Sequence, residues 1–364
     1  MGKPNVLQFN KCSNCGACLN ICPVDAITIK EDNLFYELSI SNECIQCGVC
    51  ADNCPENTKV QTGTTPFFAV AGAHIDKNIV NKSSSGGFFS ALAEYIICQD
   101  GIVFGAVFDD RFKSVSIGNS DEHNLDDLRR SKYTESLVHK SFQKIKKHLL
   151  QGKKVLFCGT PCQVAGLKCY LQKEYDNLLT CDFLCGGLSS HSLYKQWLEK
   201  LERQYNAQVT SVNFRPKILG WGEYTFSVSF SNGKTYDNTA GLDPYFWSFL
   251  HRKSIRPNCC DCTFVGRHFS DFTLADFWRY KELSDLPDNR IGLSLVGINT
   301  HKGKVILNQV SDFQICTEVD VERAFPVKKK CLMNMMIDKE KIFLNIVKMA
   351  NLKKQYVQWD FQAD

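Results

Sequence analysis

The sequence predicts a small α+β domain followed by a larger α/β domain with a mixed sheet. Two cysteine-rich runs, at 11–28 and 42–58, flank short strand-like segments. After residue 81, apolar strand-like segments alternate with helical patterns, as is typical of α/β proteins. The turn-rich segment TGTTP separates the two parts. We therefore expect a small domain at 1–62, a linker at 63–80 and a large domain at 81–364.

Composition narrows the class of protein. The chain has 364 residues, a net charge of +4 and 19 cysteines. No apolar run approaches the roughly 20 residues that a membrane span needs, and the N-terminus lacks a secretory apolar region, so we expect a cytoplasmic protein. In such a chain many cysteines indicate metal or redox chemistry rather than a disulfide framework. The mild basicity does not by itself favour a nucleic-acid partner.

The small domain contains an internal repeat of cysteine spacing. Cys12 and Cys44, 32 positions apart, each begin a C-x2-C-x2-C-x3-C-P run. This spacing resembles that of bacterial-type ferredoxins with two 4Fe-4S clusters, in which the fourth cysteine of each run binds the other cluster. Gly16 and Gly48 fall where a Cβ would crowd the loop. One predicted ligand set is Cys12, Cys15, Cys18 and Cys54, and the other is Cys44, Cys47, Cys50 and Cys22.

The remaining features of the small domain agree with this interpretation. The segments AITIK and LFYELSI are predicted strands that pair between the two cysteine loops. The alternatives are a structural zinc site or a disulfide knot. Zinc sites usually present two C-x2-C pairs rather than a triplet with a distant Cys-Pro, so the zinc alternative fits the spacing less well.

The large domain begins with the segment NKSSSGG, which opens an apolar-striped helix. A Ser-Gly-Gly turn at a helix N-terminus can bind an anion, but a plain helix cap explains the local sequence equally well. GIVFGAVFDD, KKVLFC and NLLTCDFLC are predicted buried strands, and KKVLFC leads through GTP into a helix. FSVSFSNGKTY is a predicted hairpin with an Asn-Gly turn, and IGLSLVGINTHKG is a further strand followed by a helix.

Four cysteines of the large domain could form a third cluster site. Cys162 follows one strand, Cys185 follows the next, and a C-x2-C pair lies in the later loop. For Cys162, a ligand or nucleophile and a buried packing residue remain alternatives. Cys158 and Cys181 each precede a predicted ligand by four positions and are the nearest substitutes. The predicted third set is Cys162, Cys185, Cys259 and Cys262.

An ordered set of motifs resembles one family. The motifs are SSSGGFFSALA, SKYTES, GKKVLFCGTPCQVAGL, CDFLCGG, NFRPKILGW, RPNCCDC, SDFTLADFW and GLSLVGINTHKG. They are similar to the coenzyme F420 hydrogenase/dehydrogenase beta-subunit family, in its bacterial form with an N-terminal ferredoxin unit. The resemblance implies an iron–sulfur flavoprotein that binds FAD and passes electrons between clusters and a two-electron carrier such as F420.

The resemblance also implies positions for the cofactors. It places the third cluster at the four cysteines already named. The residues it places against the flavin are Ser85, Gly86, Gly87, Lys132, Tyr133, Gly159, Thr160 and Pro161. Two departures stand out: Gly186 replaces a histidine that many relatives carry, and Ala275 and Arg279 replace glycines. Arg215, Lys217, Arg252, Lys253 and Arg256 could meet an anionic carrier or FAD phosphates, but scattered surface charges are the simpler interpretation.

The predicted function is that of an FAD-dependent iron–sulfur oxidoreductase with two ferredoxin clusters and a third cluster. The expected partners are an electron-transfer protein, such as ferredoxin or a reductase subunit, and F420 or another soluble hydride carrier or small substrate. Nucleic acid is not an expected partner, and the sequence identifies no catalytic residue. Two alternatives are a non-catalytic electron-transfer subunit and a thiol reductase that uses Cys259 and Cys262 as a redox pair.

Overall fold

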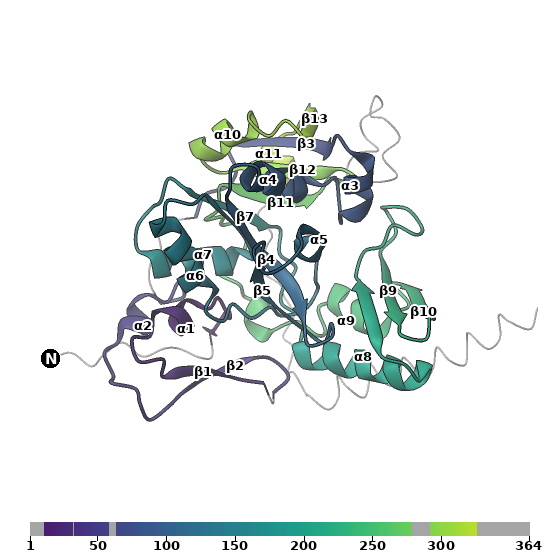
Figure 1. The fold of residues 1–364 in the computed structure, drawn as a ribbon, viewed down its shortest axis with the longest axis horizontal. Coiled ribbons are helices and arrows are strands. Elements are labelled where there is room, and N and C mark those ends of the chain that lie inside the picture. The colour runs from purple at the N-terminus through teal and green to yellow at the C-terminus, as the bar shows by residue number, and fades with distance from the viewer. Residues whose placement is uncertain (1–10, 32, 58–62, 279–291, 326–364) are drawn as a thin grey trace, which may run out of the picture.

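The computed structural model describes residues 11–31, 33–57, 63–278 and 292–325. The small domain lies along one side of the large domain, with its hairpin at the bottom of the view in Figure 1. Its elements in chain order are α1 (Ala17–Ile21), β1 (Ile27–Lys30), β2 (Glu37–Ile40) and α2 (Val49–Asp52). Strands β1 and β2 pair antiparallel, with Ile27 opposite Ile40, which confirms the predicted pairing of these segments.

The two cysteine loops repeat in backbone conformation as well as in sequence. Gly16 (φ 82°) and Gly48 (φ 77°) precede α1 and α2, and both adopt the left-handed conformation that glycine tolerates best. Asn14 (φ 56°) and Gln46 (φ 55°), again 32 positions apart, are left-handed too. A Cβ on Gly16 would lie 2.5 Å from Cβ of Val138, so this glycine also allows the loop to approach the large domain.

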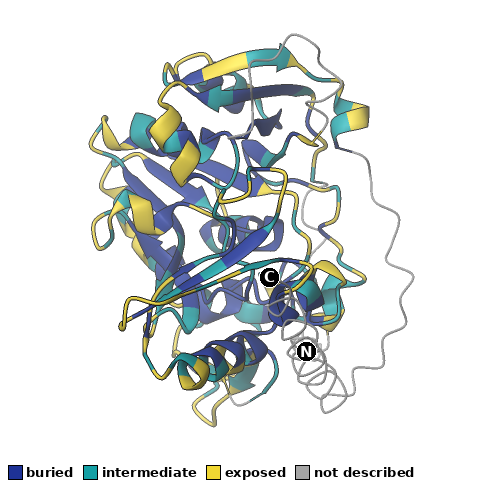
Figure 2. Ribbon diagram, turned by 90° about the vertical axis from the view of Figure 1, so that its right-hand side faces the viewer, coloured by how far each residue is buried: buried dark blue, intermediate teal, exposed yellow. Residues whose placement is uncertain are grey.

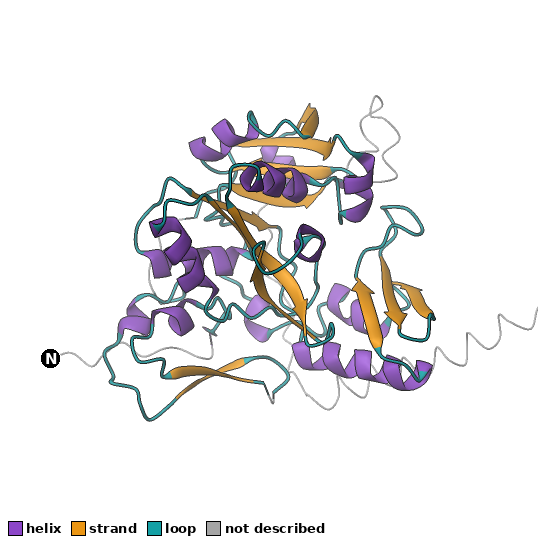
Figure 3. Cartoon of the chain, in the orientation of Figure 1, coloured by secondary structure: helices purple, strands orange, loops and turns teal. Residues whose placement is uncertain are grey.

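The large domain is built on an eight-stranded mixed sheet, which agrees with the predicted fold class (Figure 3). The central strands β4, β6, β7 and β11 run parallel, and the outer strands pair antiparallel. The order across the sheet is β13 (Phe313–Glu318), β3 (Phe68–His74), β12 (Ser294–Ile298), β11 (Phe272–Asp276), β7 (Leu178–Phe183), β6 (Val155–Cys158), β4 (Ile102–Asp109) and β5 (Ser114–Asn119).

The structure differs from the predicted linker at 63–80. Strand β3 pairs with β12 on one side and β13 on the other, and α3 (Lys77–Lys82) follows it. Most of β3 is buried, because its apolar run FAVAGAH completes the sheet. The turn-rich TGTTP therefore precedes the first strand of the large sheet directly, and the large domain begins well before residue 81.

Helices cover the sheet and enclose its core. They are α4 (Phe88–Ile97), α5 (Leu125–Leu128), α6 (Ser141–Leu150), α7 (Pro161–Leu171), α10 (His301–Leu307) and α11 (Val321–Ala324). Figure 2 shows the buried strands between more exposed helices and loops. Phe88 of α4 packs edge-on against Phe272 and Phe313, with ring centroids 5.2 and 4.8 Å away. These contacts fix α4 across the strands β11 and β13.

Residues 191–250 form a separate unit of the large domain, with a three-stranded sheet of its own and two helices. It contains α8 (His191–Tyr205), β8 (Val209–Asn213), β9 (Thr225–Phe230), β10 (Thr235–Thr239) and α9 (Pro244–Leu250). β9 and β10 form the predicted hairpin, and Gly233 in its turn has φ 79°. Phe214, Phe226 and Phe246 pack in the core between this sheet and the two helices. In the part of the chain that the structure describes, no helix is long and apolar enough to cross a membrane.

The small domain is attached to the large domain through buried polar contacts. Asn20 of α1 donates from Nδ2 to the carbonyl oxygens of Gly16 and His139, each at 2.8 Å. The amide N–H of Gln143 donates to Asn20 Oδ1 at 3.3 Å. α1 also packs against α7, and the docked domain places its first cysteine loop beside the helix that carries Cys162.

Candidate metal centre

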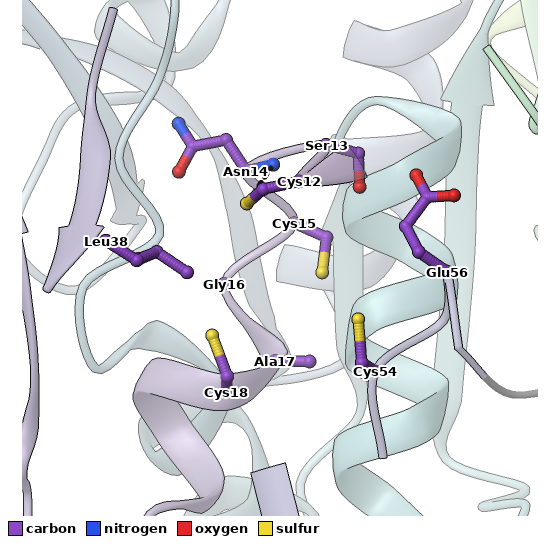
Figure 4. A pocket seen from close by; sticks show the side chains of 10 residues that line it. All are labelled: Cys12, Ser13, Asn14, Cys15, Gly16, Ala17, Cys18, Leu38, Cys54 and Glu56. Atoms are coloured by element: carbon purple, nitrogen blue, oxygen red, sulfur yellow. Dashed lines mark hydrogen bonds between the residues drawn. The ribbon is translucent and has the colours of Figure 1, made fainter. Parts of the chain in front are cut away.

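The first cysteine loop and the end of the second surround one cavity. Figure 4 shows the sulfur atoms of Cys15, Cys18 and Cys54 directed toward one another, with that of Cys12 beside the same space. Leu38 and Glu56 line the cavity as well. The structure thus brings together four cysteines from both runs. This is the arrangement that the crossed ferredoxin pattern predicts for one ligand set.

The electrostatics of this first set favour a bound cation. Burial raises the pKa of Cys12, Cys15 and Cys18, and neighbouring thiols of the set raise the pKa of Cys15 and Cys18 further. Four thiolates in one buried space therefore need compensating positive charge, which the iron of a 4Fe-4S cluster would supply. The amide N–H of Asn14 points to Cys12 Sγ at 3.4 Å, as expected for a loop that holds a cluster. The residues present fit such a group.

The second set is the outermost one. Burial raises the pKa of Cys50, and the neighbouring thiols of Cys22 and Cys47 contribute. Cys22 receives the amide N–H of Ala26 at 3.3 Å, and Cys47 is exposed. Cys44 begins the same loop, and its amide donates to the carbonyl oxygen of Ser41. The fourth cysteine of each run thus lies with the triplet of the other run.

The third set gathers cysteines from three distant segments of the large domain. Cys162 lies in the first turn of α7, directly after β6, and Cys185 follows β7. Cys259 ends the short 3-10 turn Pro257–Cys259, and Cys262 follows three positions later. Burial raises the pKa of Cys162, and the Cys185, Cys262 and Cys259 thiols raise it further. The four predicted cysteines are therefore close neighbours.

Hydrogen-bond donors point at the sulfurs of the third set. Thr160 Oγ1 lies 3.0 Å from Cys162 Sγ, and the amides of Gly187 and Leu188 donate to Cys185 and Cys259 at 3.4 Å each. Burial raises the pKa of Cys185 to about 11, although the Gly187 N–H opposes the shift. Donors of this kind tune a thiolate-held cluster. The third set thus also fits a 4Fe-4S cluster.

The two cysteines considered as substitute ligands lie in the strands of the sheet, away from the third set. Cys158 and Cys181 face each other in the register of β6 and β7, and Cys181 is fully buried in the sheet core. Within the described residues, no three Cys, His, Asp or Glu side chains are arranged to hold a single metal ion.

The first and third cysteine sets pack directly against each other. Cys15 and Cys162 pack in one buried group with Ala165 and Phe264. Cys162 Sγ lies 3.7 Å from the carbonyl oxygen of Ser13, and a Cβ on Gly166 would lie 3.0 Å from Cys15 Sγ. Gly166 therefore allows α7 to bring the two sets into direct contact.

The Ser-Gly-Gly segment is packed tightly between two strands. A Cβ on Gly86 would lie 2.4 Å from the amide nitrogen of Ser294 and 2.5 Å from the carbonyl oxygen of Gly72. Gly87 (φ 91°) is the N-cap of α4, and Ser85 Oγ donates to the carbonyl oxygen of Leu293 at 2.6 Å. Packing and capping thus account for both glycines, as one of the two alternatives drawn from the sequence expects.

A buried cationic group lies beside this segment. Arg215 forms an ion pair with Asp276 at the end of β11, with Nη1 and Oδ2 2.6 Å apart. Lys217 donates from Nζ to the carbonyl oxygens of Ser85 and Val80, at 2.9 and 2.6 Å. Arg215 is only 5% exposed, so the interpretation of this residue as a scattered surface charge is wrong. Both cations occur in the motif NFRPKILGW, and this motif was the feature of the sequence that could have indicated their place in the site.

Lys132 and Tyr133 belong to the same region. Burial lowers the pKa of Lys132 to about 7, and its Nζ donates to the carbonyl oxygen of Arg129 at 2.9 Å. Burial, followed by the charge of Arg215, lowers the pKa of Lys217 to about 7 as well. The pKa of Tyr133 is raised by burial, against the effect of the Arg215 charge nearby. An anionic ligand here would restore the positive charge of both lysines.

Aromatic rings complete the cationic region. The guanidinium carbon of Arg215 lies 4.1 Å from the ring centroid of Tyr224 and 5.3 Å from that of Trp278. Trp221 stacks on Trp278, with centroids 4.6 Å apart. Of the two glycine replacements in this motif, Ala275 lies in β11, and Arg279 lies outside the described residues.

The Gly159–Pro161 turn lies against the third cysteine set. Thr160 caps α7 by accepting the Gln163 amide N–H at 3.3 Å, and Gln163 Oε1 accepts the Thr160 N–H at 3.0 Å. This turn follows the end of β6, whereas the Ser-Gly-Gly segment packs against β12. Two strands, β7 and β11, lie between β6 and β12 in the sheet. At ordinary strand spacing the two places are about 14 Å apart along the sheet. They can meet one ligand only if it is long.

Comparisons with known proteins identify both domains. Residues 152–324 match the family described as the C terminus of the beta subunit of coenzyme F420 hydrogenase/dehydrogenase, and residues 11–58 match the 4Fe-4S dicluster domain. No curated protein matches the chain. One similar solved structure is a chain of the xenon-derivatised F420-reducing [NiFe] hydrogenase complex from Methanosarcina barkeri, with 17% identity and a TM-score of 0.48. That alignment covers 80% of this chain and 92% of the other.

The two family matches meet the geometry at the same residues. The dicluster match contains both cysteine runs of the small domain, and the beta-subunit match contains all four cysteines of the third set. The chain is an iron–sulfur electron-transfer protein that combines a domain of the coenzyme F420 hydrogenase/dehydrogenase beta-subunit family, at residues 152–324, with an N-terminal 4Fe-4S dicluster domain.

Proposed function

We propose that this protein is an oxidoreductase that passes electrons through three 4Fe-4S clusters to or from a bound FAD, which exchanges hydride with a soluble carrier such as F420 or with a small substrate. The observation that supports it best is the contact between the first and third cysteine sets, with Cys15 packed against Cys162. The Cys50 thiol likewise influences Cys18, which links the second set to the first. The three sets thus form a series that ends at the large sheet.

The carboxyl edge of the sheet offers a place for the flavin. Open α/β sheets bind ligands outside the carboxyl ends of their parallel strands. Here that edge carries Asp276 at the end of β11 and Cys185 after β7, with Arg215 paired to Asp276. Arg215, Lys217 and Lys132 would bind the FAD phosphates, and the Trp221–Trp278 pair would pack against a ring. A bound flavin supplies the exchange between single electrons and hydride.

Measurement of cofactors per chain tests this proposal. Protein purified without oxygen is expected to contain about 12 iron and about 12 sulfide per chain, as three 4Fe-4S clusters require, and one FAD. Reduced F420, NAD(P)H and reduced ferredoxin are then screened as electron donors by following bleaching of the flavin absorbance. The donor that reduces the protein identifies the carrier.

Other outcomes select the alternatives. Full iron and sulfide without flavin would contradict the flavoprotein proposal and favour a non-catalytic electron-transfer subunit. About 8 iron per chain would place clusters only in the small domain. Thiol–disulfide activity at Cys259 and Cys262 with that iron content would favour the thiol reductase.

A further inference from the structure

A buried ion pair lies where the two domains meet. Arg256 directly precedes the turn that carries Cys259, and Glu135 lies in the SKYTES segment. The residues are 7% and 0% exposed, and Arg256 Nη1 pairs with Glu135 Oε1. Buried ion pairs rarely add stability over an apolar replacement, because desolvation of the charges offsets their attraction. The position of this pair suggests another use.

The contacts of Arg256 reach into the first cysteine loop. Its Nε donates to the carbonyl oxygen of Cys12 at 3.0 Å, and its Nη2 donates to the carbonyl oxygen of Tyr36 at 2.8 Å. Glu135 also contacts both domains. Its Oε2 accepts the amide N–H of Tyr36, in the small domain, at 3.0 Å and lies 3.2 Å from Nδ1 of His191, in the large domain. The guanidinium is therefore fixed in place by both domains.

Arg256 lies beside two cysteine sets at once. Its guanidinium contacts the backbone of Cys12 in the first set, and its own carbonyl oxygen accepts the amide N–H of Cys259 in the third set at 2.9 Å. The Glu135 carboxylate instead accepts from the amide of Tyr36. The positive end of the pair is therefore the part that contacts the first cysteine loop, and its backbone continues into the turn that carries Cys259.

A fixed positive charge changes how easily a nearby cluster is reduced. Reduction adds negative charge, and net charge and hydrogen bonding are among the factors that set cluster potentials. In a buried environment such a charge acts with little screening. We propose that Arg256, oriented by Glu135, is a shared tuning residue that raises the reduction potentials of both the first and the third cluster relative to the second. This inference rests on the proposed clusters at these sets.

The test compares Arg256→Met with Arg252→Met in the full chain, purified without oxygen. Arg252 donates from Nη2 to the carbonyl oxygen of Cys259 at 3.1 Å, which places its guanidinium beside the third set. Potentiometric titration followed by low-temperature EPR resolves the cluster potentials. Two of three midpoint potentials should shift downward in Arg256→Met, and one in Arg252→Met. Arg256→Lys, which keeps the charge, should leave all three near their original values.

Additional variants guard against loss of folding. Arg256→Met leaves the Glu135 carboxylate buried without its cation, so the double variant Arg256→Met/Glu135→Gln removes both charges. It should show the same two downward shifts, smaller than those in Arg256→Met. Lower iron content with unchanged potentials in the remaining clusters would assign Arg256 a purely structural role and overturn the proposal, as would a shift confined to one cluster. Absence of iron–sulfur signals in the unmodified protein would instead contradict the proposed function.

Discussion

At the residue scale, the cationic region shows how far burial changes the properties of a side chain. Lys132 and Lys217 both have a pKa near 7, because the charged form is desolvated. Their side chains already contact backbone carbonyl oxygens, which hold the amines in place. The region is thus prepared to respond to an anionic ligand by binding protons.

This property predicts a pH dependence for FAD binding. Below pH 7 both lysines are charged before FAD binds, so the affinity should be constant. Above pH 7 each lysine must take up a proton when the phosphates bind, so the affinity should fall, by up to about tenfold per pH unit for each lysine. Flavin fluorescence titration of FAD-depleted protein between pH 6 and pH 9 measures this, with pH values chosen to bracket the lowered pKa.

Replacement of one lysine isolates its contribution. Lys132→Met should reduce the number of protons taken up on FAD binding by about one, which lowers the slope of the logarithm of the affinity against pH. Lys234→Met, at an exposed turn of the β9–β10 hairpin, should leave it unchanged. If FAD binds with the same affinity at pH 7 and pH 9 in the unmodified protein, these lysines do not meet the phosphates.

At the scale of elements, α7 shows why a strand followed by a capped helix suits a ligand cysteine. Pro161 occupies the first helical position and Thr160 closes a capping box, so the start of the helix is fixed. Cys162 therefore occupies a defined place beside Cys15, while Cys158 remains in the strand. The two cysteines are four positions apart but have different surroundings.

These surroundings predict different effects of serine at the two positions. Cys162→Ser should lose about four iron per chain, because a hydroxyl is a poor substitute for a thiolate ligand of a 4Fe-4S cluster. Cys158→Ser should keep the full iron content, since its neighbour is Cys181 in the sheet. Iron and sulfide analysis of both variants decides between them. Equal iron loss in the two variants would show that the third set is wrongly assigned.

Local sequence predicted the elements whose signals are local. The paired segments β1 and β2, the hairpin at Asn232-Gly233 and the β6–α7 unit each carry their own turn or cap residues. β3 was missed because its run follows directly after TGTTP, and its neighbours in the sheet come from the C-terminal part of the chain. The burial of Arg215 was missed for a related reason. Its partner Asp276 lies 61 positions away, and sequence spacing does not reveal such a pair.

At the scale of the whole molecule, the site depends on how the small domain is docked. Gly16 and Asn20 contact the large domain, and Tyr36 stacks on His191 with ring centroids 3.6 Å apart. The spacing of the cysteines predicted the membership of each set. Their side-by-side placement could not be predicted, because it depends on contacts between residues more than a hundred positions apart.

Removal of one docking contact should weaken this arrangement. Asn20→Ala leaves the carbonyl oxygen of His139 without its donor and should lower the free energy of unfolding by about 1–3 kcal/mol. Denaturant unfolding of protein purified without oxygen measures the loss, and hydrogen exchange should increase in α1. Asn42→Ala, at an exposed position, should change the free energy by less than about 0.5 kcal/mol. Equal stability of the two variants would show that Asn20 does not hold the domains together.

The position of β3 has a consequence for the order in which the protein matures. β3 lies near the start of the large domain, yet both strands that flank it, β12 and β13, are synthesised after all the other strands of the sheet. The small domain contains all eight of its cysteines within residues 12–54, and the residues that line the first cysteine cavity all come from this domain. Domains generally fold as units during synthesis, the N-terminal one first. Iron can therefore bind to the nascent small domain before β12 and β13 of the large sheet have been synthesised.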